Sequence, residues 1–267
     1  MKLNRTKIWL LIAVSGFLLV LPPITLAVDE PFYLTVIARI MIFAIAALSL
    51  DLILGFGGMI SLGHAAYLGI GAYAVGILSF YGINNAWLQL PVAFFGSAIV
   101  AFIIGIICLR TSGIYFIMIT LAMTQLLYFL GISLETYGGD DGLPIDRSIF
   151  FEAFDLGDET NLYYLIFAFL VIITLFSWRL INSRFGVVIR GAQENEMRMH
   201  AIGFSTFRYK LLAFTIAGSM CGLSGFLYAN LNEFVTPEYM HWFRSGEIMI
   251  MVLVGGMGTL FGPLFGA

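Results

Sequence analysis

The chain has 267 residues, of which 60% are hydrophobic and 11% are charged, and its net charge is −3. Roughly a quarter of the residues of a soluble domain are charged, so this composition excludes one. Long unbroken apolar runs also exclude a membrane β-barrel, whose strands alternate in hydrophobicity. We therefore expect an all-α, polytopic transmembrane bundle of about 8–9 spans, forming a single domain over residues 1–267 with glycine-broken segments.

The first predicted span covers about Ile8–Ala27 and follows three basic residues. Its length suffices to cross the hydrocarbon core of a bilayer. The stretch Thr25-Leu26-Ala27 would also suit the cleavage site of a secretory signal peptide. We favour a retained first span with a cytoplasmic N-terminus, and a cleaved signal peptide is the alternative.

The second span is predicted over about Phe32–Leu54, with Arg39 near its start and Asp51 near its end. Six glycines follow at positions 55, 57, 58, 63, 69 and 71, which makes the first part of Gly55–Gly82 a poor continuous helix. We therefore expect a break or a re-entrant turn before span three. Irregular backbone at such depth must be buried in protein or line a wet cavity.

The remaining spans are separated by short turns and two long polar segments. Spans four to eight are predicted over about Trp87–Leu109, Tyr115–Leu134, Asn161–Leu180, Tyr209–Asn230 and Glu247–Leu260. The sequence stops in a glycine-rich stretch that resembles the start of another helix. We expect from this that the last span has been cut off.

The two long polar segments carry opposite charges. Residues 135–160 hold eight of the sixteen acidic residues, whereas the loop at 181–208 and its flanks hold six of the thirteen basic ones. Positive charge near span ends resists translocation, which predicts a cytoplasmic basic loop. Counting spans then places the acidic loop in the periplasm.

A short helix is predicted inside the basic loop. Asn195 can cap it, Glu196–Ile202 form two turns, and Gly203 can end it with a left-handed backbone. A capped helix at the membrane face suits docking of a soluble partner. An ordinary positive-inside loop explains the same residues equally well.

Two glycine-rich stretches resemble each other: GGMISLGHA at Gly57–Ala65 and GGMGTLFGP at Gly255–Pro263. Paired glycine-interrupted segments in the two halves of a transporter often mark its pathway. Chance similarity between glycine-rich turns is the alternative.

The sequence lacks the motifs of an enzyme. It has no phosphate-binding loop of the type G-x-x-x-x-G-K-[ST], so it is not expected to hydrolyse ATP alone. Its three histidines lack the spacing of metal ligands, and Cys108 and Cys221 lie in apolar runs. We expect neither catalysis nor a cofactor or metal ion.

Polar residues inside the predicted spans are the candidates for a substrate pathway, because such residues usually face the bundle interior or a cavity. They are Asp51, His64, Thr124, Gln125 and Glu247. Structural roles are the alternatives. Asp51 can cap the glycine-rich turn, His64 can bond freed carbonyls at the break, and Thr124 and Gln125 can bond a neighbouring helix.

Several stretches together resemble the M-type permease subunit of bacterial ABC importers for branched-chain amino acids. They follow in order along nearly the whole chain after span one, at Leu50–Gly55, Ser61–Ala66, Gly69–Tyr73, Arg110–Phe116, Gly138–Leu143, Ser183–Gly186 and Gly255–Thr259. Each is weakly specific alone, whereas the set is highly specific.

The resemblance implies an inner-membrane subunit that pairs with a homologous H-type permease, two cytoplasmic ATPase subunits and a periplasmic substrate-binding protein, and no nucleic acid. It places ATPase coupling at Glu194, Asn195, Glu196, Arg198, Ala201 and Gly203. The chain departs from the family at Arg198-Met199, where an Ala-Ala pair is usual. Urea or short amides are alternative substrates, and a stand-alone secondary transporter or a membrane scaffold is an alternative function.

Overall fold

The structure is a computed structural model that describes residues 16, 18–23, 31–151 and 154–267. Most of the predicted first span lies outside these residues. The described helices are α2 (Pro31–Leu54), α3 (His64–Phe80), α4 (Ala86–Cys108), α5 (Ile114–Ser133), α6 (Glu159–Ile181), α7 (Arg184–Glu194), α8 (Glu196–Ala201), α9 (Thr206–Asn232), α10 (Trp242–Gly255) and α11 (Gly262–Gly266). Two 3₁₀ turns, η1 (Glu135–Tyr137) and η2 (Pro237–Met240), accompany them.

Five of these helices are long and apolar enough to cross a membrane, namely α2 from Phe32 onward, α4, α5, α6 and α9. They confirm predicted spans two and four to seven and the all-α fold. The helices α3 and α10 are shorter, with 17 and 14 residues.

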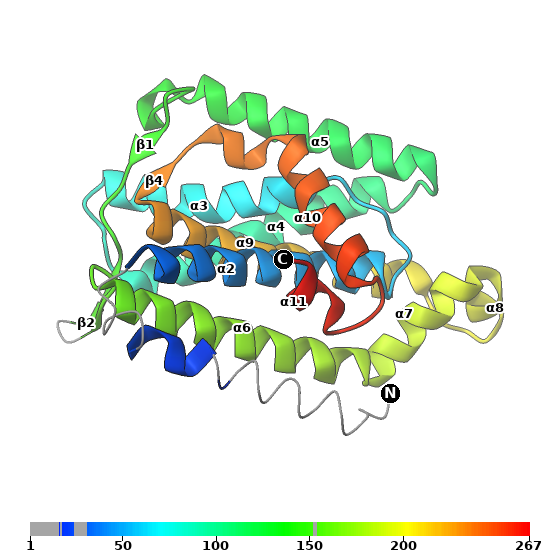
Figure 1. Cartoon of the computed structure of the whole chain (residues 1–267). Helices are drawn as coiled ribbons and strands as arrows, with labels where there is room; N and C mark the ends of the chain where they lie inside the picture. Colours follow the sequence, from blue (N-terminus) through cyan, green and yellow to red (C-terminus); the bar gives the residue numbers. More distant parts are fainter. Residues whose placement is uncertain (1–15, 17, 24–30, 152–153) are drawn as a thin grey trace.

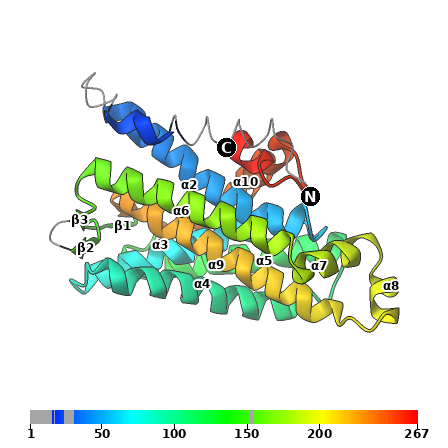
Figure 2. The same ribbon diagram turned by 90° about the horizontal axis from the view of Figure 1, so that it is seen from below.

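The long helices lie side by side, so that connecting segments gather at two ends of the bundle (Figure 1). At one end, called here the strand end, β1 (Leu143–Pro144) pairs with β4 (Phe234–Val235), and β2 (Ile149–Phe151) pairs with β3 (Phe154–Asp155). At the opposite end α7 and α8 extend beyond the other helices, as both views show (Figure 2). We call this the α8 end.

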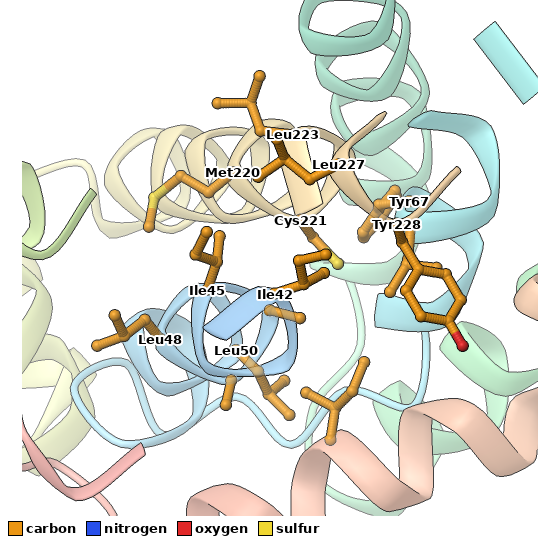
Figure 3. Close-up of a cluster of buried hydrophobic side chains, with 14 of the residues drawn as sticks. Ile42, Ile45, Leu48, Leu50, Tyr67, Met220, Cys221, Leu223, Leu227 and Tyr228 are labelled. Atoms are coloured by element: carbon orange, nitrogen blue, oxygen red, sulfur yellow. The ribbon is translucent and has the colours of Figure 1, made fainter. Parts of the chain in front are cut away.

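The core forms around α2 and α9. Figure 3 shows Ile42 and Ile45 of α2 directed toward α9, which contributes Met220 and Leu227 among others. All four side chains are at most 3% exposed. Apolar residues surround these two helices on nearly every face, so they are central elements on which the others pack.

Close contact between α9 and α3 depends on glycine. A Cβ atom built on Gly225 would lie 1.9 Å from the Leu68 carbonyl oxygen, and one on Gly71 would lie 2.0 Å from the Gly222 carbonyl oxygen. No side chain fits at either position. Small residues of this kind let helix backbones approach closely in membrane proteins.

The expected break before span three is present. The chain leaves α2 at Leu54, and residues 58–63 are not helical before α3 begins at His64. Gly58 adopts a φ of +65°, which favours glycine at this turn. The segment returns into the bundle, where threonines of α5 bond it.

A second broken segment follows α9. Residues 233–241 run back along α3, because Val235 packs at Gly76 and Met240 at Gly69, and the Ser245 hydroxyl accepts a hydrogen bond from the Ala65 N–H (2.9 Å). From Gly76 to Ala65 this return covers about 16 Å at 1.5 Å per residue. The helix α10 therefore begins deep inside the bundle.

The prediction for span eight was wrong at both boundaries. The helix covers Trp242–Gly255 instead of Glu247–Leu260. It begins earlier because His241 caps it, with Nδ1 accepting from the Phe243 N–H at 3.4 Å. It ends earlier because Gly256 and Gly258 adopt φ values of +105° and +69°, which an α-helix does not accommodate.

Candidate functional site

The predicted helix in the basic loop is present as α8. Asn195 Oδ1 accepts a hydrogen bond from the Arg198 N–H at 2.9 Å, as expected of the capping residue. Gly203 has a φ of +93° and donates to the His200 carbonyl, while the Phe204 N–H donates to the Met199 carbonyl. These two bonds form a Schellman motif, which stops the helix at its C-terminal end.

The preceding helix α7 was not predicted, although its signal is in the sequence. Val188, Ile189 and Ala192 lie on one face and are buried, a spacing typical of an amphipathic helix. Its start is held by Arg190, which donates to the Ile181 carbonyl at 3.1 Å. Gly186 lies against that same carbonyl, where a Cβ atom would approach to 2.1 Å. The α7–α8 pair is therefore a defined structure.

Met199 holds α8 against α7. It is 9% exposed and packs with Val188, Ala192 and Tyr209. Its neighbour Arg198 is exposed. Arg198 and Met199 stand where the resembled family usually has an Ala-Ala pair. Met199 thus fixes the helix, and Arg198 faces outward.

Glu196 connects α8 to α9. Its carboxylate accepts hydrogen bonds from the Thr206 hydroxyl (2.8 Å) and from Lys210 Nζ (2.7 Å). His200 Nε2 lies 2.8 Å from the same hydroxyl. These contacts therefore join α8 to the start of α9, a helix that runs through the middle of the bundle.

The link through Glu196 predicts a pH dependence. Burial opposes ionisation of Glu196, but the bonds from Lys210 and Thr206 outweigh burial, and the pKa lies below its ordinary value of 4.5. The ionised group therefore stabilises the junction above pH 4.5, and this stability is lost as the pH falls through the folded-state value. Protection of the α8 amides from hydrogen exchange, corrected for intrinsic rates, should decrease in that acidic range. Glu196→Gln should lower protection already at pH 7, and unchanged protection in that variant would contradict the assignment.

The surface of α8 that faces away from the bundle is unusually apolar. Met197 is 83% exposed and Ile202 is 64% exposed. All six predicted coupling residues are exposed as well, namely Glu194, Asn195, Glu196, Arg198, Ala201 and Gly203. Of these, Asn195 and Glu196 also cap and anchor the helix. Apolar residues gathered at a protruding surface are typical of an interaction site.

The loop also contacts the broken segment after α2. Gln193 Nε2 donates to the Gly55 carbonyl at 3.3 Å. Gly55 in turn lies against Gly258, so closely that a Cβ atom on Gly55 would be 2.2 Å from the Gly258 nitrogen. The segment that follows α2 and the second glycine-rich stretch, Gly255–Pro263, therefore approach each other at the α8 end.

Asp51 joins these two stretches. Its Oδ1 accepts a hydrogen bond from the Gly258 N–H at 2.9 Å, across 207 positions of sequence. Asp51 is 1% exposed, so it lies inside the protein. Asp51 thus caps the turn that follows α10. Together with the contacts of Gly55 with Gln193 and with Gly258, this bond connects the α7–α8 pair to the end of α10.

Thr124 positions the broken segment before α3. Its hydroxyl lies 3.2 Å from the Leu62 carbonyl and 2.9 Å from the Thr120 carbonyl, and the Thr120 hydroxyl accepts from the Leu62 N–H. Both threonines are fully buried. The two side chains therefore satisfy both backbone polar groups of Leu62, as irregular backbone in a membrane requires.

Thr124→Val should lower the free energy of unfolding by about 1–3 kcal/mol, because it leaves the partly buried Leu62 carbonyl without its partner. The measurement is thermal unfolding in detergent. Thr174→Val is the matched control, since the Thr174 hydroxyl bonds only the Leu170 carbonyl of its own helix. Equal effects of the two substitutions would contradict a special role of Thr124.

The other pathway candidates lie apart. His64 is fully buried at the start of α3, with its ring 5.7 Å from that of Tyr67. Gln125 is partly buried on α5, and its Nε2 has no hydrogen-bond partner in the described part of the chain. Glu247 is partly exposed on α10 and pairs with Arg244 at 2.9 Å. Arg244 was not among the predicted pathway residues, because the predicted span began after it.

No metal centre is found in the described ranges, where no three His, Cys, Asp or Glu side chains are grouped closely enough to hold an ion. The geometry instead combines a protruding, apolar loop with two broken segments inside an apolar bundle. This arrangement suits a transport subunit that is driven by a partner protein bound to the protruding loop.

Comparisons with known proteins agree with this description. The chain is 30% identical to the high-affinity branched-chain amino acid transport system permease protein LivM of Salmonella typhimurium, over 91% of this chain and 64% of that protein. It is 26% identical to the probable branched-chain amino acid transport permease protein LivM of Methanocaldococcus jannaschii, over 84% and 75% of the two chains. It is 28% identical to the autoinducer 2 import system permease protein LsrC of Yersinia pseudotuberculosis, over 73% and 50%.

The chain thus spans somewhat less than two thirds of the length of the Salmonella relative. No solved structure matches it significantly. The sequence model of the family described as branched-chain amino acid transport system / permease component matches residues 32–267, which include every helix from α3 to α11 and nearly all of α2. The chain therefore belongs to this family of membrane-embedded transport permeases.

Proposed function

We propose that the chain is the permease subunit of an ATP-binding-cassette importer in the bacterial inner membrane, and that α8 docks an ATPase subunit from the cytoplasm. The observation that carries this proposal is the combination of exposure and anchoring in α8. Met197 and Ile202 face outward, while Met199 and Glu196 fix the helix to α7 and α9. A partner that binds the outward side of α8 can therefore move the bundle.

A route for that movement leads to α10. The contacts run from Gln193 to Gly55, and from Asp51 to Gly258 just beyond the end of α10. The broken segment after α2 begins on this route, and broken helices in transporters commonly lie at the site where access alternates between the two sides. We propose that ATP-driven displacement of α8 shifts α10 relative to α2.

The remaining partners follow from the two ends of the bundle. With α8 in the cytoplasm, residues 135–160 lie in the periplasm and the N-terminus in the cytoplasm. The acidic side chains there can attract basic patches of a periplasmic substrate-binding protein and so speed its encounter. We propose a second, homologous permease as the partner in the membrane. Hydrolysis of ATP belongs to two ATPase subunits, since this sequence carries no phosphate-binding loop.

The proposed substrates are branched-chain amino acids. Both LivM relatives are named for transport of these compounds, whereas the Yersinia relative is named for import of autoinducer 2. Urea and short amides are the alternative. Competition of labelled leucine uptake by unlabelled valine and isoleucine, and not by urea or acetamide, is expected in the assembled importer.

Assembly is tested by expressing the tagged chain with the products of its neighbouring genes and purifying it in detergent. We expect two ATPase subunits and one second permease to co-purify. A chain that purifies alone and still transports in vesicles would favour the stand-alone transporter over this proposal.

A further inference from the structure

A line of polar side chains follows the face made by α2, η2 and α10, from the strand end toward the middle of the bundle. Arg39 of α2 is exposed, and its Nη2 donates to Asn232 Oδ1 at 3.1 Å. Asn232 Nδ2 donates to the Tyr239 hydroxyl at 3.1 Å. Arg244, in the first turn of the α10 helix that follows, forms the ion pair with Glu247 at 2.9 Å.

The ion pair lies far from both ends. Arg244 adjoins Ser245, which bonds Ala65, and Ala65 is about 22 Å below the strand end of α3 at Phe80, at 1.5 Å per residue. From Arg244 to the end of α10 at Gly255 is about 16 Å along α10, or about three helical turns, and α10 lies oblique to α3 (Figure 1). The charges are therefore near the middle of the membrane.

The two charged groups are partly exposed at the surface of the isolated chain. The Arg244 and Glu247 side chains are 30% and 33% exposed. Charged groups at this depth face a bundle interior or a water-filled cavity, because exposure to hydrocarbon is costly. The exposed part of this face must therefore border water or another protein.

The charges on this face match an amino acid head group. Arg244 and Glu247 present opposite charges one turn apart on the same helix, and no carboxylate pairs with Arg39 within the described ranges. A zwitterion carries a carboxylate, which guanidinium groups bind well, and an ammonium group, which a carboxylate accepts. Urea, a neutral molecule, gains little from such a pair.

We infer that this face lines the substrate passage, that Arg39 and Arg244 bind the carboxylate of an α-amino acid, and that Glu247 binds its ammonium group. Arg39 meets the substrate first, and the Arg244–Glu247 pair receives it at mid-membrane. The inference rests on the proposed function and extends it by naming the groups that recognise the substrate.

The first test measures leucine import by the assembled importer in proteoliposomes. The double variant Arg244→Gln, Glu247→Gln and the single variant Arg39→Gln should assemble normally and lower Vmax/KM by at least about tenfold, as loss of charge-assisted bonds predicts. Arg179→Gln, at the end of α6 and away from this face, is the matched control and should transport as the wild type does. Unchanged import by the Arg244 and Glu247 double variant would overturn the inference.

The second test asks whether water reaches this face, and it does not depend on transport activity. In the complete complex, Arg244→Cys should react with a charged, membrane-impermeant thiosulfonate, and leucine should slow the reaction. Ile172→Cys, on the 59% exposed surface of α6, should stay unreacted. The native Cys108 and Cys221 are buried and give a low background. No labelling of Arg244→Cys would show contact with a partner subunit instead of water, and would overturn the inference.

The two proposals fail differently. If wild-type complexes import leucine with ATP and the variants do so equally well, only the assignment of Arg39, Arg244 and Glu247 is wrong. If wild-type complexes assemble but do not import leucine, the proposed substrate is wrong and this inference falls with it.

Discussion

Replacement of both Met197 and Ile202 by glutamate is expected to abolish stable association of the ATPase subunits with this chain. These two side chains are 83% and 64% exposed in the isolated chain. Burying an apolar side chain of this size contributes about 1.5–3 kcal/mol, so losing both weakens binding by about 100-fold or more. Two buried carboxylates without partners would weaken it further. The measurement is the amount of ATPase that co-purifies with the tagged chain.

The control for this prediction keeps the surface apolar. Met197→Leu with Ile202→Val should retain ATPase binding within about threefold, since volume-conserving apolar exchanges are tolerated. The glutamate variant should still fold, because neither side chain contributes to the core. Binding at wild-type level by a folded glutamate variant would show that α8 is an ordinary surface loop.

Gly225→Leu is expected to prevent folding of the bundle. A Cβ atom there would lie 1.9 Å from the Leu68 carbonyl oxygen and 3.0 Å from the Ala72 nitrogen. Both are backbone atoms of α3, which cannot recede without separating the two helices. We expect a loss of at least about 4 kcal/mol, beyond the range of ordinary substitutions. Size-exclusion profiles in detergent, followed by thermal unfolding, measure this effect.

Gly96→Leu on α4 is the matched control. No atom lies within 4 Å of a Cβ built on Gly96, and leucine has a higher helix propensity than glycine. This variant should fold and should be at least as stable as the wild type. Similar behaviour of Gly225→Leu and Gly96→Leu would show that α3 and α9 are not packed as described.

Local features of this fold could be predicted because their causes are local. The apolar run of α2 is long enough to identify a span from its own residues. Likewise Asn195 and Gly203 mark the two ends of α8, because capping depends on residues within one turn. The break before α3 followed from the glycines of residues 55–63 in the same way.

Contacts between distant segments could not be predicted. The bond from Gly258 to Asp51 spans 207 positions, and that from Thr124 to Leu62 spans 62. Every face of these helices is apolar, so hydrophobic periodicity does not show which face meets which neighbour. For this reason the sequence identified Asp51 and Thr124 as candidates but not the partners that define their roles.

The boundaries of α10 were missed for a different reason. Residues 233–241 pass through the bundle as the short strand β4 and the 3₁₀ helix η2, which pack against glycines of α3 and bond the Asn232 side chain of α9. Tertiary contacts outweigh local propensity here. As a result Arg244 lay outside the predicted span, and its pairing with Glu247 was not predicted.

The most direct test of the central claim is uptake of labelled leucine by proteoliposomes that contain this chain with its second permease, ATPase subunits and binding protein. We predict uptake that requires hydrolysable ATP on the side of the ATPase subunits. This uptake should stop when Met197 and Ile202 are replaced by glutamate. Uptake driven by a proton or sodium gradient, without ATP and without the ATPase subunits, would contradict it.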